Sequence, residues 1–237
     1  MSDFIILKNI SHSFDDKKVL DGLNITINKG SFHSLVGVSG SGKSTTLKLI
    51  SSLLPLSGGE IENTSKRISF AFQQSPLIPW LNVRDNLKIC TKDVSSIDEY
   101  LKSFNLKEIS SQFPAELSGG MIQKINILRS FLGNPDLILM DEPFVHIDSI
   151  QKEILHEFLL SLWNKNRPTI IFVTHDIDEA LYLSQEISLF SIKRKNVTET
   201  LEISKKENST YLDLKSSEDY PVYFKRIYNH LKQDQLI

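Results

Sequence analysis

Short apolar runs alternate with amphipathic segments along most of this chain. Phe32–Val38, Asp136–Met140 and Thr169–Thr174 are rich in apolar and β-branched residues and are bounded by polar residues, glycine or proline. Runs of this length and composition predict strands that are buried on both faces. Because segments with helical spacing separate them, we expect an α/β fold with a mainly parallel sheet covered on both sides.

The segments between these runs have the spacing of helices. Lys43–Leu54 places four apolar residues on one helical face, and Pro55 then ends the pattern. Ser118 precedes another such segment and is expected to cap it. Further helices are predicted at 83–112, Gly119–Phe131, Ile150–Trp163, Ile177–Leu183 and near 220–233.

Weaker strand patterns occur near both ends of the chain. Phe4–Leu7 and Leu20–Ile27 are followed or broken by Asp-Gly and Lys-Gly pairs, which predicts short antiparallel strands joined by turns. Two more strands are expected at 187–192 and 197–203, just before the final helix.

Composition narrows the choice of partners. The 27 basic and 29 acidic residues among 237 give a formal charge of −2, so no overall basic field points to nucleic acid. Cys90 is the single cysteine, which fits a reducing compartment. The N-terminus lacks a signal-peptide pattern, and no apolar run approaches the about 20 residues that span a bilayer. We therefore expect any membrane association to run through a partner.

A glycine-rich loop between the third strand and the first long helix carries the clearest chemistry. Gly37–Ser44 matches G-x-x-x-x-G-K-[ST] between a strand and a helix, the context in which backbone N–H groups cradle phosphates. Lys43 is expected to reach the β- and γ-phosphates, and the Ser44 hydroxyl to bind Mg²⁺. The residues predicted to bind ATP here are Gly37, Ser39, Gly40, Ser41, Gly42, Lys43, Ser44 and Thr45.

The loop alone leaves kinases, switches and motors open, and three later motifs narrow the choice. Leu-Ser-Gly-Gly-Met-Ile-Gln-Lys occupies 117–124, Leu-Ile-Leu-Met-Asp-Glu-Pro occupies 137–143, and Val-Thr-His-Asp occupies 173–176. Their order resembles the nucleotide-binding domain of an ATP-binding cassette (ABC) protein along nearly the whole chain. A small-molecule kinase is the alternative outside the family, but the 117–124 motif has no role in one.

The resemblance implies a P-loop NTPase fold in which 1–237 form a single ABC ATPase domain. Its parts would be a core with a mainly parallel sheet and an antiparallel β-subdomain, from 1–82 and 133–237, and a helical subdomain at about 83–132. The stretch between Trp80 and Leu117 is short for the family, so the geometry of partner docking transfers least well.

The resemblance also implies that the site is shared between two copies. Ser118, Gly119 and Gly120 correspond to the signature motif, which faces the ATP held by a second copy in a head-to-tail, two-fold dimer. Asp148 belongs to the loop that crosses the dimer interface. His146 and Ile147 stand where relatives usually carry Ala-Leu, a change that bears on coupling between the sites.

The remaining roles follow by position in the family motifs. Asp141 would meet the coordination sphere of Mg²⁺, and Glu142 would orient or deprotonate the attacking water. His175 resembles the switch histidine that contacts the γ-phosphate. Gln73 resembles the glutamine that couples Mg²⁺ and water to the transmembrane partner, although Gln74 leaves the register open. Phe14 resembles the aromatic residue that stacks on adenine.

Local sequence favours one branch of the family. Leu-Ile-Pro-Trp at 77–80, Leu-Ser-Gly-Gly-Met and Thr-His-Asp-Ile-Asp-Glu-Ala-Leu resemble importers of nitrate, taurine, alkanesulfonates and thiamine precursors. We expect an importer ATPase at the cytoplasmic face of the inner membrane, working with permease subunits and a solute-binding protein. An exporter or lipid-trafficking ATPase and a soluble, non-transport ABC ATPase are the alternatives.

Overall fold

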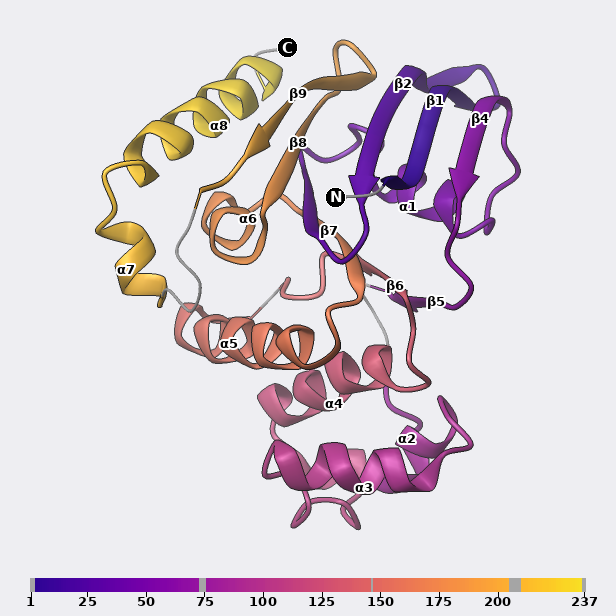
Figure 1. The fold of residues 1–237 in the computed structure, drawn as a ribbon, viewed down its shortest axis with the longest axis vertical. Coiled ribbons are helices and arrows are strands. Elements are labelled where there is room, and N and C mark those ends of the chain that lie inside the picture. The colour runs from indigo at the N-terminus through magenta and orange to yellow at the C-terminus, as the bar shows by residue number, and fades with distance from the viewer. Residues whose placement is uncertain (1–2, 73–75, 146, 205–209, 236–237) are drawn as a thin grey trace.

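Figure 1 shows the computed structural model, which describes residues 3–72, 76–145, 147–204 and 210–235. A central sheet is flanked by helices, with a smaller antiparallel sheet at one side and a group of helices at one end. No helix in these ranges is long and apolar enough to cross a membrane.

The central sheet has six strands, and all of its neighbouring pairs are parallel except the last. This confirms the predicted α/β class with a mainly parallel sheet. The antiparallel exception is a hairpin at one edge. In spatial order the strands are β5 (Ile68–Ala71), β6 (Leu137–Asp141), β7 (Thr169–Thr174), β3 (Phe32–Val36), β8 (Glu186–Ser191) and β9 (Asn196–Glu202).

Alternate residues of each central strand enter two different cores. In β7, Ile170 and Phe172 pack into one apolar cluster, while Ile171 and Val173 pack into the cluster on the opposite face. All four are 0% exposed, so both faces of the strand are dry. This is the physical reason why the strand reads as an uninterrupted apolar run rather than an alternating one.

Helices cover the two faces unequally. One core lies between the sheet and α4 (Gly119–Phe131), α5 (Ser149–Asn166) and α6 (Ile177–Leu183). The other lies between the sheet, α1 (Lys43–Ile50) and the antiparallel strands. The remaining helical elements are α2 (Val83–Lys88), α3 (Val94–Ser103), η1 (Pro114–Glu116), α7 (Tyr211–Lys215) and α8 (Tyr220–Gln235).

The antiparallel sheet has the order β2-β1-β4 and is larger than the sequence predicted. β1 (Asp3–Phe14) and β2 (Lys17–Asn28) run well beyond the apolar segments, and β4 (Gly58–Asn63) was not predicted at all. β4 pairs with β1 but contains one apolar residue, Ile61, opposite Leu7. β5 is also short, with only four residues. Neither β4 nor β5 therefore has enough alternating apolar positions to predict a strand.

Some predicted helices are shorter in the structure. α1 ends at Ile50 instead of Leu54, because Ser52 adopts a left-handed φ of 59° and the Leu53 N–H then donates to the carbonyl of Lys48. The 83–112 segment contains two separate helices and connecting turns. Asn82 caps the first helix, and Asp93 caps the second.

Gly59 of β4 offers a test of how tightly the antiparallel sheet is built. Its φ is 92°, and a Cβ there would lie 2.4 Å from the Asn9 carbonyl oxygen. We expect Gly59→Ala to lower the free energy of unfolding by about 2–3 kcal/mol, measured by urea denaturation. Gly58→Ala is the control, because a Cβ there meets its nearest atom at 3.8 Å. Equal effects of the two substitutions would contradict this account.

Candidate functional site

The glycine-rich loop leaves β3 and turns directly into α1. Gly40 and Gly42 have φ values of 81° and 100°, a backbone that side chains other than glycine rarely adopt. At Gly42 a Cβ would also lie 2.5 Å from Leu20 Cδ2. Backbone sterics therefore require glycine at these two positions, and the resulting turn directs N–H groups toward the start of the helix.

Lys43 is folded back over the loop. Its side chain is buried, and Nζ donates to the carbonyl oxygens of Gly37 at 2.7 Å and Val38 at 2.9 Å. Burial lowers the pKa of Lys43, while the charges of Glu142 and Asp141 act in the opposite direction. A phosphate in the loop would supply the full negative charge that this buried ammonium lacks.

Ser44 and Asp141 place two side-chain oxygens close together next to the loop. The Ser44 hydroxyl donates to Asp141 Oδ1 at 2.7 Å, and Asp141 is the last residue of β6. Burial raises the pKa of Asp141, the Ser44 hydrogen bond lowers it, and the neighbouring charge of Glu142 raises it further. The described residues hold no group of three or more His, Cys, Asp or Glu side chains that could bind a metal. Two adjacent hard oxygens fit Mg²⁺, which takes one or two protein ligands together with phosphates and water.

Glu142 and His175 meet at the ends of adjacent strands. The Glu142 N–H donates to the carbonyl of Val173 at 3.0 Å, which holds the residue at a left-handed φ of 47°. Its Oε2 lies 3.3 Å from His175 Nδ1, and the histidine side chain is 61% exposed. The structure thus brings together two residues that are 33 positions apart in sequence and leaves one face of the imidazole open.

The signature residues make contacts of a different kind. The Ser118 hydroxyl accepts a hydrogen bond from the Met121 N–H at 3.3 Å, as a helix cap does. A Cβ on Gly119 would meet nothing within 4 Å, whereas one on Gly120 would lie 2.2 Å from Gln151 Oε1. Asp148 in turn caps α5 by accepting from the Gln151 N–H at 3.0 Å. Gln151 therefore lies between the signature residue Gly120 and the aspartate loop, residues 144–148, which ends at Asp148.

The structure describes some of the other predicted site residues and leaves two outside the described ranges. Phe14, at the end of β1, is 45% exposed and packs edge-to-face on His12 with ring centroids 4.9 Å apart. Its exposed ring leaves room for stacking. Ser41 is buried in the loop. Gln73 and His146 lie outside the described residues.

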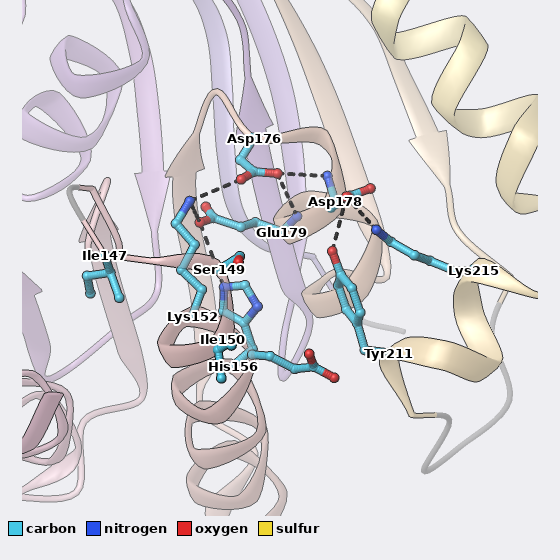
Figure 2. Close-up of a pocket in the computed structure, with 11 residues that line it drawn as sticks. Ile147, Ser149, Ile150, Lys152, His156, Asp176, Asp178, Glu179, Tyr211 and Lys215 are labelled. Atoms are coloured by element: carbon cyan, nitrogen blue, oxygen red, sulfur yellow. Dashed lines mark hydrogen bonds and ion pairs between the residues drawn. The ribbon is translucent and has the colours of Figure 1, made fainter.

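A cluster of charges that the sequence reasoning missed joins α5 to the turn after His175 (Figure 2). Lys152 Nζ lies 3.1 Å from Asp176 Oδ2 and 2.9 Å from Glu179 Oε1. Thr174 adds a 2.6 Å hydrogen bond to the other oxygen of Glu179. Lys152 is one turn beyond Asp148, and Asp176 directly follows His175. The cluster therefore ties the aspartate-loop helix to the switch-histidine turn.

The cluster borders a cavity of about 430 Å³. Burial on its own raises the pKa of Glu179, but contacts with His156, Thr174 and Lys152 outweigh it, so the pKa lies below its usual value. Neither ring nitrogen of the buried His156 has a hydrogen-bond partner among the described residues, although Nε2 lies 3.8 Å from Glu179. The sequence places Lys152 four residues after Asp148, a spacing that puts both on one face of a helix. Nothing in the sequence indicates that Lys152 pairs with Glu179.

Comparison with known proteins decides the family. Residues 20–145 match the family model described as ABC transporter. The chain is 36% identical over 235 residues to the aliphatic sulfonates import ATP-binding protein SsuB of Bacillus cereus, covering 93% of this chain and 91% of that protein. The chain belongs to the ABC transporter family. A Bacillus subtilis protein of the same name is 37% identical over 187 residues, covering 74% of this chain and 73% of the relative.

Solved ABC structures have the same fold. A dimeric bacterial ABC transporter cassette matches with a TM-score of 0.71 at 28% identity, covering 86% of this chain and all of that one. An ABC transporter ATP-binding cassette matches with a TM-score of 0.78 at 21% identity, covering 96% of this chain and 99% of that one, a likeness of fold. This ABC chain is an ATP-binding domain and an ATPase.

The buried charge of Asp141 should make the nucleotide-free chain less stable. Because its folded pKa is raised, ionisation costs stability above that pKa, and the cost vanishes below the unfolded value of 3.8. Asp141→Asn keeps an acceptor for Ser44 and removes the charge. We expect its Tm to rise by roughly 2–4 °C at neutral pH. Calorimetry should show this gain shrinking as the pH approaches 3.8. A fall in Tm would contradict the account.

Removing Lys152 should leave Glu179 as a buried and poorly paired carboxylate. We expect Lys152→Met to lower the free energy of unfolding by about 2 kcal/mol, less than for a fully buried pair because the lysine is partly exposed. Urea denaturation measures the change, with Lys152→Arg expected to retain most of the stability. Lys102→Met, at an exposed position of α3, is the matched control. Equal effects at 102 and 152 would show that the cluster contributes nothing.

Proposed function

We propose that this chain is the ATP-hydrolysing motor subunit of an importer for a small organic anion, of the class to which sulfonates belong. Two copies would form a head-to-tail dimer and drive partner permease subunits. The observation that carries the proposal is the convergence of Ser44, Asp141, Glu142 and His175 at one edge of the sheet. The SsuB relatives support import of sulfonates.

Each residue at this edge would have a distinct part in hydrolysis. The loop amides and Lys43 would bind the β- and γ-phosphates, with Lys43 exchanging its carbonyl partners for phosphate oxygens. Ser44 and Asp141 would hold Mg²⁺, which neutralises charge on the phosphates. Glu142 would accept a proton from the attacking water or orient it.

His175 would contact the γ-phosphate through its exposed ring while Nδ1 faces Glu142. Gln73 would couple Mg²⁺ and water to the membrane partner, and Phe14 would stack on adenine. The remaining loop residues, Ser39, Ser41 and Thr45, would complete the phosphate site.

A second copy would complete each site. The open backbone at Gly119 gives a γ-phosphate from another chain access to the start of α4, where Ser118 and the helix N-terminus favour an anion. The Ser118 hydroxyl would then exchange its cap contact for a phosphate oxygen. Asp148, at the start of α5, would face the partner copy across the interface.

The helical part of the chain would dock on the membrane subunits. We propose to treat 83–132 as this subdomain, and 1–82 with 133–237 as the core. Large apolar side chains are exposed in and next to the helical part, which is the character of a protein-docking surface. They are Phe72, Trp80, Ile89, Val94, Phe113 and Met121. Such docking would place the chain at the cytoplasmic face of the inner membrane, with a solute-binding protein completing the system.

Glu142→Gln tests the assignment of the base. The amide keeps the shape of the side chain but cannot take a proton, so the ATPase rate should fall by about 10²–10³-fold while ATP binding persists. With ATP the variant should accumulate as a dimer, measured by light scattering after size-exclusion chromatography. Glu157→Gln, at an exposed position of α5, is the matched control. Hydrolysis by Glu142→Gln at the unaltered rate would refute this role.

Co-purification from membranes distinguishes the transporter from its alternatives. The tagged chain should recover permease subunits, and deletion of the system should abolish uptake of a sulfonate supplied as sole sulfur source. Export of a solute by the recovered complex would favour an exporter. Recovery of soluble proteins alone would favour a non-transport ABC ATPase and refute the importer.

A further inference from the structure

We propose that the C-terminal helix α8 positions the phosphate loop through Asp234, so that this carboxylate sets the affinity for nucleotide without touching it. The end of β8 and the residue after it, Phe190–Ile192, would transmit the effect. The proposal rests on nucleotide binding by the 37–44 loop and adds a positioning residue near the C-terminal end of α8.

One side of the Phe190–Ile192 segment lies against the loop. A Cβ on Gly37 would lie 2.8 Å from the Phe190 carbonyl oxygen and 2.9 Å from Phe190 Cβ. A Cβ on Gly40 would lie 3.6 Å from Ile192 Cδ1. The segment therefore forms a wall along the loop, and it passes closest to the loop at two glycines. A shift of this wall would change the space in which the phosphate-binding turn is folded.

The other side of the same segment is held by α8. Asp234 is 4% exposed, and its two oxygens accept from the Ser191 hydroxyl at 2.8 Å and the Ile192 N–H at 2.7 Å. One helical turn earlier, His230 Nε2 lies 2.9 Å from the Phe190 carbonyl oxygen. Phe190, Ser191 and Ile192 are thus each hydrogen-bonded to a residue of α8. Figure 1 shows α8 lying along the β8–β9 hairpin in this region.

The central sheet pairs with this segment through β9 alone. Parallel pairing of β8 with β3 ends at Val36 and Leu189, before the segment begins. Phe190 and Ser191 still pair with Val197 and Asn196 of β9, after a register shift between Leu189 and Phe190, while Ile192 lies beyond the end of β8. Hydrogen bonds to an ionised acceptor are stronger than those between neutral groups. Asp234 therefore adds two hydrogen bonds, to Ser191 and Ile192, where the pairing with β3 has ended, and these bonds distinguish it from a helix residue that only packs.

Asp234→Asn tests the proposal in the full chain. The amide has one acceptor oxygen in place of two, so it cannot keep both observed bonds as an acceptor, and any bond that it keeps or reverses loses the charge of the carboxylate. We expect the Kd for a fluorescent ATP analogue to rise about fivefold. The titration is run at a temperature where circular dichroism shows the variant to be folded. Asp219→Asn is the control, because it removes the same charge from an exposed position just before α8.

A double-mutant cycle separates positioning from a general loss of stability. Ile192→Ala removes the side chain that lies beside Gly40 on the loop side of the wall. If Asp234 acts through this wall, the effects of Asp234→Asn and Ile192→Ala on Kd are not additive. Additive effects, or a Kd within twofold of the unaltered chain in Asp234→Asn, would overturn the proposal. Absence of nucleotide binding by the unaltered chain would refute the site on which it rests.

Discussion

Parallel hydrogen bonding between β3, β6 and β7 is the constraint on which the rest of this molecule depends. The ladder pairs Val36 with Thr174 and Asp141 with Val173, so the carboxyl ends of the three strands meet at one edge. The glycine-rich loop, Asp141 and the residues that follow β6 and β7 all emerge there. Ligands of open α/β sheets bind at this edge for the same reason. A change in register by one residue would exchange the two cores as well as misplace the site.

The charged side chains at this edge lower the stability of the protein without nucleotide. Lys43 is buried with carbonyl partners instead of a counter-ion, and Asp141 is partly buried beside another carboxylate. The two pKa values move toward the neutral forms, as burial requires. The polyanionic nucleotide and its cation would remove both penalties at once. The site is therefore arranged for its ligand rather than for the stability of the free chain, a pattern typical of functional sites.

Two sets of contacts tie distant motifs to one another. Lys152 joins the aspartate-loop helix to the turn after His175, and Gln151 lies against the signature glycine Gly120. On the other side of the loop, Asp234 holds the segment that lies along Gly37 and Gly40. In each case a side chain on a helix links two segments that are distant in sequence. Such contacts link elements at some distance from the phosphate loop to the segments around it.

The sequence by itself determined the parallel sheet, the phosphate loop and the positions of Asp141, Glu142 and His175, because uninterrupted apolar runs and motif spacing are local properties. It could not reveal β4 and β5, which are short, polar or at an edge and are fixed by their pairing with other strands. Nor could it show the contacts of Lys152 or Asp234, since their partners lie 24 or more positions away in sequence. Only the tertiary structure decides contacts of that kind, because hydrogen-bond and charge partners are chosen by packing in space.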